Sequence, residues 1–216
     1  MTQLSCLRHA EAENNVRQTM APSLDSPLTP RGRDQAAAAA EQLRHRSAVR
    51  VYCSTAARAL ETATIVAGPA GLDVVPLADL NEVEIGPEAD PADERTRAAA
   101  VVALRSWIVD QDLRAPFVGG ETGTSVVRRT GDALKAIVSD HPGETIVVVG
   151  HVASLTAALS VVCGLHAELW GRPLPHAMPF TSKPERPGRA GSGRGRLSVG
   201  VPSIGADSWR AGGRGQ

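Results

Sequence analysis

The chain has 216 residues, of which 42% are hydrophobic and 21% charged, and this suits one globular domain with a substantial core. Its formal net charge is zero and no segment is apolar for long enough to cross a membrane, so composition argues against a nucleic-acid partner and against a membrane protein. The start of the sequence lacks the basic and apolar regions of a secretory signal, so we expect a cytoplasmic protein.

Strands and helices alternate along the first part of the chain. Residues 3–7 are predicted as a short buried strand that ends at Arg8, and the polar residues 10–28 as a long loop. Thr29 and Pro30 are typical of a helix start, because threonine caps the helix and proline fits its first position. The elements that follow are a helix to about residue 46, a strand over 49–54, a helix over 55–68 and a strand over 72–77.

The alternation continues after the acidic, irregular residues 78–90. Asp90 and Pro91 are predicted to open a helix that lasts to about residue 112. A loop over 115–124 leads to a helix over 125–139. The stretch ETIVVVGH, residues 144–151, is β-branched and apolar on both faces, so it is predicted as the central strand, and a helix over 152–164 follows it.

This order of elements predicts an α/β fold: a three-layer α/β/α sandwich with a mostly parallel central sheet. Residues 1–181 are expected to form the catalytic domain. Residues 182–196 are rich in Pro, Gly and Arg and are predicted as a flexible loop. Residues 197–216 are expected to add a final strand over 197–202 and a C-terminal tail to the same domain.

Four basic side chains are predicted to meet at one rim of this sheet. His9 and His151 each follow a predicted strand, and open α/β sheets bind their ligands beyond the carboxyl ends of the strands. Arg8 ends the first strand, and Arg58 lies in the first turn of the helix after the second strand. A guanidinium fork matches the oxygens of a phosphate, so these residues indicate a pocket for a phosphate group.

Six short motifs, in order, resemble those of the histidine phosphatase superfamily, which is also called phosphoglycerate mutase-like. They read RHAE (8–11), DSPLTPRGRDQA (25–36), STAARALETA (54–63), LNEVEIG (80–86), GGET (119–122) and VVVGHVASL (147–155). Ala10 stands where the family commonly has glycine, and Val152-Ala153 stand where it has Gly-Gly. The resemblance implies a phosphoglycerate mutase-like fold and favours the phosphatase branch.

The resemblance also implies a role for each residue of the predicted pocket. His9 would attack phosphorus and become a phosphohistidine, with its other ring nitrogen bonded to an acceptor such as a backbone carbonyl. Arg8, Arg58 and His151 would bind the phosphoryl oxygens and stabilise the transition state. Glu82 would act as the general acid on the leaving alcohol.

Other assignments at this pocket remain open. Glu84 lies two positions from Glu82 and is the other candidate for the general acid. Asn15 and Val152 are further candidates for substrate binding. No metal and no cofactor are expected, because the arginines supply the positive charge that the reaction needs.

The sequence therefore predicts a metal-independent phosphatase that acts on a small phosphomonoester through His9. The alternatives are a mutase-type phosphotransferase, and a protein that binds a phosphorylated ligand with weakened catalysis. The segment 83–118, expected to cover the pocket, has no basic cluster for a second charged group, which argues against a bisphosphoglycerate-dependent mutase. The expected partner is a small molecule, with no nucleic acid and no membrane, and a homodimer is left open.

Other chemistries fit this sequence less well. Cys6, Cys53 and Cys163 are widely spaced and lie in apolar stretches, which is typical of buried reduced thiols. Only four residues separate Cys53 from Arg58, whereas a cysteine phosphatase loop has five. No His or Cys residues have the close spacing of a zinc site.

Overall fold

The computed structural model describes residues 2–20, 25–164, 174–184 and 197–200. The strands are β1 (Gln3–Arg8), β2 (Ala48–Cys53), β3 (Val74–Pro76), β4 (Thr145–Gly150), β5 (Phe180–Pro184) and β6 (Leu197–Gly200). The α-helices are α1 (Glu13–Val16), α2 (Pro30–Leu43), α3 (Ala57–Ala67), α4 (Glu94–Ile108), α5 (Gly123–Asp140) and α6 (Val152–Val162). Short 3₁₀ helices are η1 (Arg44–Arg46), η2 (Gly68–Ala70) and η3 (Ala78–Leu80).

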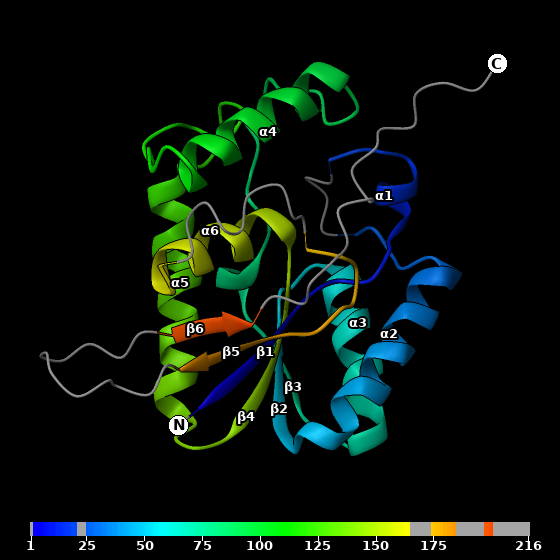
Figure 1. The fold of residues 1–216 in the computed structure, drawn as a ribbon. Helices are drawn as coiled ribbons and strands as arrows, with labels where there is room; N and C mark the ends of the chain where they lie inside the picture. The colour runs from blue at the N-terminus through cyan, green and yellow to red at the C-terminus, as the bar shows by residue number, and fades with distance from the viewer. Residues whose placement is uncertain (1, 21–24, 165–173, 185–196, 201–216) are drawn as a thin grey trace, which may run out of the picture.

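The strands form one mixed sheet in the order β3-β2-β4-β1-β5-β6 (Figure 1). The pairs β2–β3, β2–β4 and β1–β4 are parallel, and β5 joins β1 and β6 in antiparallel pairs. β4 lies between β2 and β1, so the prediction that it is a central strand is confirmed. The predicted mostly parallel sheet is confirmed as well.

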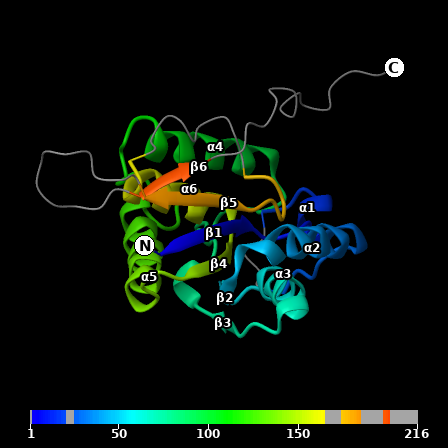
Figure 2. The ribbon, with the colours of Figure 1, turned by 60° about the horizontal axis from the view of Figure 1, so that its bottom comes forward.

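Helices cover both faces of the sheet, which confirms the three-layer sandwich (Figure 2). Alternate residues of β4 build the two interfaces, as the two-residue period of a strand requires. Val147 and Val149 pack in the core under α2 and α3, whereas Ile146 and Val148 pack in the core under α5 and α6. A strand that is buried on both faces explains the continuous apolar run at this point of the sequence.

A third apolar cluster seats α4 above the carboxyl ends of the strands (Figure 1). Ala100, Ala103 and Trp107 of α4 are buried there together with Phe117. The Trp107 indole N–H donates to the carbonyl of Ala115 at 2.8 Å, and its ring lies 5.3 Å from that of Phe117. The position of α4 over this end of the sheet makes it one wall of the candidate site.

Most predicted elements lie within a few residues of their observed bounds, and two predictions were wrong. The helix predicted from Pro30 to about residue 46 is confirmed, as an α-helix to Leu43 and a 3₁₀ helix over Arg44–Arg46. The polar stretch 10–28 is not all loop, because α1 lies inside it. The helix predicted from Asp90 starts instead at Glu94, because the Asp93 side chain caps it by accepting the N–H of Arg95.

The late part of the chain differs in one respect from its prediction. β5 runs to Pro184, so residues 182–184 of the predicted loop belong to a strand paired with β1 and β6. β6 lies within the range predicted as a late strand. The rest of the predicted loop, 185–196, and the tail from residue 201 lie outside the described residues.

Two further sequence predictions concern the core and the membrane. Cys6, Cys53 and Cys163 are buried and free, as predicted. Among the described residues, the structure has no helix that is both long and apolar enough to cross a membrane.

Candidate active site

Two parallel strands bring His9 and His151 together. Arg8 at the end of β1 is in register with Gly150 at the end of β4, and the backbone N–H of His9 donates to the carbonyl of Gly150 at 2.9 Å. Each histidine is therefore the first residue beyond its strand. The two imidazole rings lie 5.1 Å apart in an edge-to-face arrangement.

The hydrogen bonds of His9 determine its neutral tautomer. Its Nδ1 lies 2.7 Å from the carbonyl oxygen of Ala10, which can only accept, so Nδ1 carries the proton. Its Nε2 keeps a lone pair and accepts from Nε of Arg58 at 3.3 Å. Burial lowers the pKa of His9 well below its usual range, and electrostatic coupling to His151, Arg8 and Arg58 acts in the same direction. His9 is thus a neutral imidazole with its free nitrogen beside a guanidinium.

His151 is held in the opposite tautomer. Its Nδ1 lies 3.4 Å from Nη2 of Arg58, which can only donate, so the proton lies on Nε2 and is donated to Oγ of Ser54 at 2.7 Å. The Ser54 hydroxyl in turn donates to Oδ1 of Asn81 at 2.7 Å. Burial lowers the pKa of His151 well below its usual range, and the charges of Arg58 and Arg8 add to this effect.

Arg8 and Arg58 place two guanidinium groups beside these rings. Arg58 lies in the first turn of α3 and is only 2% exposed. Nη1 of Arg8 donates to the carbonyl of Leu174 at 3.3 Å, and its buried Nε has no hydrogen-bond partner. Burial lowers the pKa of both arginines, and the negative charge of Glu82 opposes that change. The group forms a strongly positive site suited to an anion with several oxygens.

Glu82 is fixed at the N-terminus of α6. Its carboxylate accepts the backbone N–H of Ser154 at 2.9 Å and of Ala153 at 3.2 Å. A helix N-terminus favours negative charge, so this position holds the carboxylate next to the histidines. Glu82 lines the cavity of the site, whereas Glu84 is exposed and is absent from its lining.

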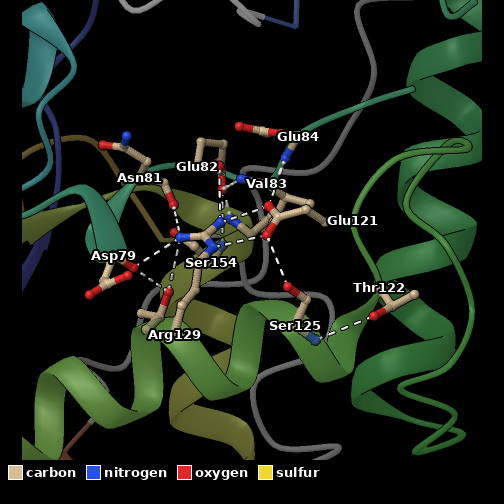
Figure 3. A network of polar contacts seen from close by, with 12 residues as sticks. Asp79, Asn81, Glu82, Val83, Glu84, Glu121, Thr122, Ser125, Arg129 and Ser154 are labelled. Atoms are coloured by element: carbon tan, nitrogen blue, oxygen red, sulfur yellow. Dashed lines mark hydrogen bonds and ion pairs between the residues drawn. The ribbon is translucent and has the colours of Figure 1, made fainter. Parts of the chain in front are cut away.

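An ion pair between Arg129 and Glu121 holds the segment that carries Glu82 (Figure 3). Arg129 donates to both carboxylate oxygens of Glu121, at 3.0 and 2.8 Å. The same guanidinium donates to the carbonyl oxygens of Asp79, Asn81 and Glu82, at 2.9, 2.8 and 3.1 Å. Its five N–H groups are all engaged by this set, and Glu121 also accepts the N–H of Glu84 at 3.0 Å.

At Gly32 and Gly120, each in one of the sequence motifs, another stretch of backbone passes so close that no side chain would fit. A Cβ on Gly32 would lie 2.0 Å from the carbonyl oxygen of Glu11, and a Cβ on Gly120 would lie 2.1 Å from that of Glu84. Gly32 therefore lets α2 pack against the loop after His9, where Gln35 also accepts the N–H of Glu11 at 2.9 Å. Gly120 does the same for the segment after Glu82.

The site opens into a cavity of about 270 Å³. Its polar lining consists of Arg8, His9, Asn14, Asn15, Thr19, Arg58, Glu82 and Arg97. Asn15 lies at the end of α1 and uses its side-chain oxygen to accept the N–H of Ala12 at 3.0 Å. Val152 lines the cavity from the first turn of α6, and His151 is the residue immediately before it, at the N-cap of the helix.

His176 belongs to the site and was missed by the sequence analysis. Its ring lies 5.7 Å from that of His9, and its Nδ1 lies 3.0 Å from the carbonyl oxygen of His9. The backbone around His176 pairs with Arg8, since the N–H of Ala177 donates to the carbonyl of Arg8 at 3.0 Å. Burial lowers the pKa of His176 to about 4. The only local signal was a histidine in the proline-rich stretch PLPHAMP (173–179), which has no strand pattern.

Two competing site chemistries find little support in the described residues. Burial raises the pKa of Cys53 to about 11, so its thiol is protonated near neutral pH and is a poor nucleophile. Within the described ranges, no three His, Cys, Asp or Glu side chains are grouped so that they could hold a metal ion.

Fold and site together define an α/β protein with a buried histidine nucleophile candidate inside a phosphate-type anion site. A family model described as the histidine phosphatase superfamily (branch 1) matches residues 4–178. The chain therefore belongs to the histidine phosphatase superfamily, as the sequence motifs predicted.

Individual relatives carry the names of phosphatases and of mutases. The chain is 32% identical over 177 residues to a glucosyl-3-phosphoglycerate phosphatase of Mycolicibacterium vanbaalenii, covering 77% of this chain and 76% of the relative. It is 31% identical over 171 residues to a Yersinia pestis protein named probable phosphoglycerate mutase GpmB, covering 78% and 79%. Among solved structures, YhfR of Bacillus stearothermophilus has a TM-score of 0.75 and 29% identity, covering 94% of this chain and 96% of its own.

Proposed function

We propose that the chain is a phosphatase that hydrolyses a small phosphomonoester through a phosphohistidine on His9. The observation that supports this most directly is the state of His9. Its Nε2 lone pair lies beside Arg58, and its Nδ1 proton is bound by the Ala10 carbonyl. A neutral imidazole that is oriented in this way is ready to attack an electrophile held by the arginines.

The first chemical step transfers the phosphoryl group to the enzyme. Nε2 of His9 forms a bond to phosphorus while the bond from phosphorus to the alcohol oxygen breaks. Arg8 and Arg58 bind the equatorial oxygens and offset their charge, and His151 lies next to them. Glu82 acts as the general acid and gives its proton to the departing alcohol oxygen.

The second step hydrolyses the phosphohistidine. Glu82, now ionised, takes a proton from a water molecule, whose oxygen bonds to phosphorus as the bond to Nε2 breaks. The products are the free alcohol and phosphate, and His9 returns to its neutral form. No step requires a metal ion. Asn15 and Val152 line the same cavity and contact the substrate in this proposal.

A mutase is the alternative that the GpmB-type relative raises. A mutase must hold a substrate with two charged ends, but α4 contributes one cation, Arg97, to the described cavity lining. Nη1 of Arg97 already donates to the carbonyls of Gln18 and Ala92, at 3.0 and 2.7 Å. This arrangement favours release of phosphate over its return to a second hydroxyl.

The test is phosphate release from a panel of small phosphomonoesters in the presence of EDTA, with wild type and His9→Ala. We expect release by the wild type alone, because His9→Ala removes the nucleophile. Interconversion of phosphoglycerates that requires a bisphosphoglycerate primer, without phosphate release, would establish the mutase instead. Normal turnover by His9→Ala would contradict the assignment of His9. The cytoplasmic location and the absence of a nucleic-acid partner stay predictions from composition.

A further inference from the structure

Beyond the polar lining already described, which includes Asn14, Asn15 and Thr19, the cavity is lined by apolar side chains. The segment after Glu82, helix α4 and the loop before α5 supply most of them. They are Val83, Ile85, Ala100, Val101, Leu104 and Phe117. Val152 adds another apolar group, at a position where the family motif has glycine.

This apolar wall is part of the packed core. Val83 and Phe117 are 7% and 4% exposed, and Phe117 rests against Trp107 with ring centroids 5.3 Å apart. Val101 has the opposite character: it lines the cavity and is 46% exposed. The wall thus presents preformed apolar surface to whatever occupies the cavity, without first having to order a loop.

Asn14, Asn15 and Thr19 line the cavity from the segment after β1, but α4 and the segment after Glu82 offer few polar groups that could recognise a hydrophilic alcohol. Among the described α4 residues that line the cavity, Arg97 is the charged one. Its Nη1 donates to the Gln18 carbonyl and so links α4 to the segment before Met20. A sugar hydroxyl or an amino-acid carboxylate placed against valine, leucine and phenylalanine would lose its hydrogen bonds to water without replacement. An alkyl or aryl group would gain free energy from the same contact.

We propose that the natural substrate class is phosphate monoesters of small apolar alcohols, with the alkyl or aryl group packed against Val101, Leu104 and Phe117. This inference rests on the proposed phosphatase function and deepens it. It differs from the substrate in the name of the Mycolicibacterium relative, which carries a sugar and a carboxylate.

The test compares kcat/KM for straight-chain alkyl phosphates from methyl to hexyl with kcat/KM for O-phosphoserine. The alcohols of this series leave with nearly equal chemical reactivity, so differences report contacts with the wall. We expect kcat/KM to rise about fourfold for each added methylene, because burying one methylene group gains about 0.8 kcal/mol of free energy. O-Phosphoserine should be used less well than butyl phosphate.

A matched pair of variants locates the effect on α4. Val101→Asn places an amide in the cavity wall, whereas Val102→Asn makes the same change at the next residue, which is 68% exposed and absent from the described lining. Val101→Asn should reduce the gain per methylene at least twofold. Val102→Asn should leave the whole series unchanged, and thermal unfolding of both variants confirms that they fold.

The outcomes separate the two proposals. Phosphate release with no dependence on chain length, or with a preference for O-phosphoserine, would overturn the apolar substrate class and leave the phosphatase standing. Equal effects of the two asparagine variants would overturn the assignment of the wall to α4. No release from any monoester would instead overturn the proposed function and the inference with it.

Discussion

His9 and His151 are both buried and both contact Arg58, yet they carry their protons on different nitrogens. A backbone carbonyl holds the Nδ1 proton of His9, and a serine hydroxyl holds the Nε2 proton of His151. Each ring therefore turns its lone pair toward the same guanidinium. Arg58 is the donor that gives the two histidines a common orientation, and the partner behind each ring fixes its tautomer.

The Ser54 hydroxyl is the partner that can be removed by mutation. Ser54→Ala leaves the Nε2 proton of His151 buried without an acceptor, which we expect to cost about 1–3 kcal/mol of stability. We also expect kcat to fall about tenfold, which corresponds to about 1.4 kcal/mol of lost transition-state stabilisation, because the ring is no longer fixed. Chemical denaturation and steady-state kinetics measure the two effects.

Thr55→Ala is the matched control for this change. Thr55 is exposed and its hydroxyl also donates to Asn81, at 2.9 Å, but it does not contact His151. We expect its kcat to match that of wild type. If both alanine variants reduce kcat equally, the effect belongs to Asn81 and not to the tautomer of His151.

At the scale of elements, the positions of the predicted histidines and arginines were predictable from the sequence, whereas β5 and His176 were not. His9 and His151 follow strands, and Arg58 lies at the start of a helix. Ligands of open α/β sheets bind beyond the carboxyl ends of the strands, so the sequence predicted that these three residues would meet there. β5 was missed because FTSKP is short, has little alternation and ends in proline. His176 enters the site only through backbone pairing with Arg8, which no local pattern encodes.

The Arg129–Glu121 pair was missed for the same reason. Glu121 was visible as part of the GGET motif, but Arg129 reads as an ordinary charged residue of an amphipathic helix. Its contacts with the carbonyls of Asp79, Asn81 and Glu82 exist only once α5 packs beside η3 (Figure 3). Which polar group satisfies a buried carbonyl is a property of the tertiary structure.

Arg129→Lys tests how strongly α5 supports the segment that carries Glu82. A lysine keeps the charge but cannot donate to both carboxylate oxygens and three carbonyls. We therefore expect the free energy of unfolding to fall by about 2 kcal/mol. For a domain of this size the midpoint of thermal unfolding should fall by about 4–8 °C. We expect kcat to fall and KM to change little, because Arg8 and Arg58 remain in place.

Arg128→Lys provides the comparison, since Arg128 is exposed on the same helix. It should change neither the unfolding midpoint nor kcat. An Arg129→Lys variant that lost stability but kept full kcat would mean that the ion pair holds the fold without positioning Glu82.

At the scale of the whole molecule, the buried histidines make stability depend on pH. The pKa values of His9, His151 and His176 are lowered from about 6.5, that of His176 to about 4. Below pH 6.5 the unfolded chain binds protons that the folded chain does not, so stability falls as the pH falls from about 6.5 toward 4. Glu121, whose pKa is lowered by Arg129, adds a further loss only below about 4.5.

Guanidinium chloride midpoints measured at pH 7.5, 6 and 5 check this prediction. His176→Gln should flatten the dependence by removing one of the three groups, whereas His45→Gln, at an exposed position, should leave the slope as in wild type. Equal midpoints for the wild type at all three pH values would contradict it.

The place of β1 in the sheet has a consequence for the synthesis of the chain. β1 leaves the ribosome first among the strands, yet both of its neighbours, β4 and β5, come about 140 residues or more later. At about 5–20 residues per second, β1 waits roughly 7–30 s for its first partner. Throughout that interval an apolar strand has two unpaired edges, which makes the nascent chain a natural client for holding chaperones. The anion site cannot form before that wait ends, because His151 directly follows β4.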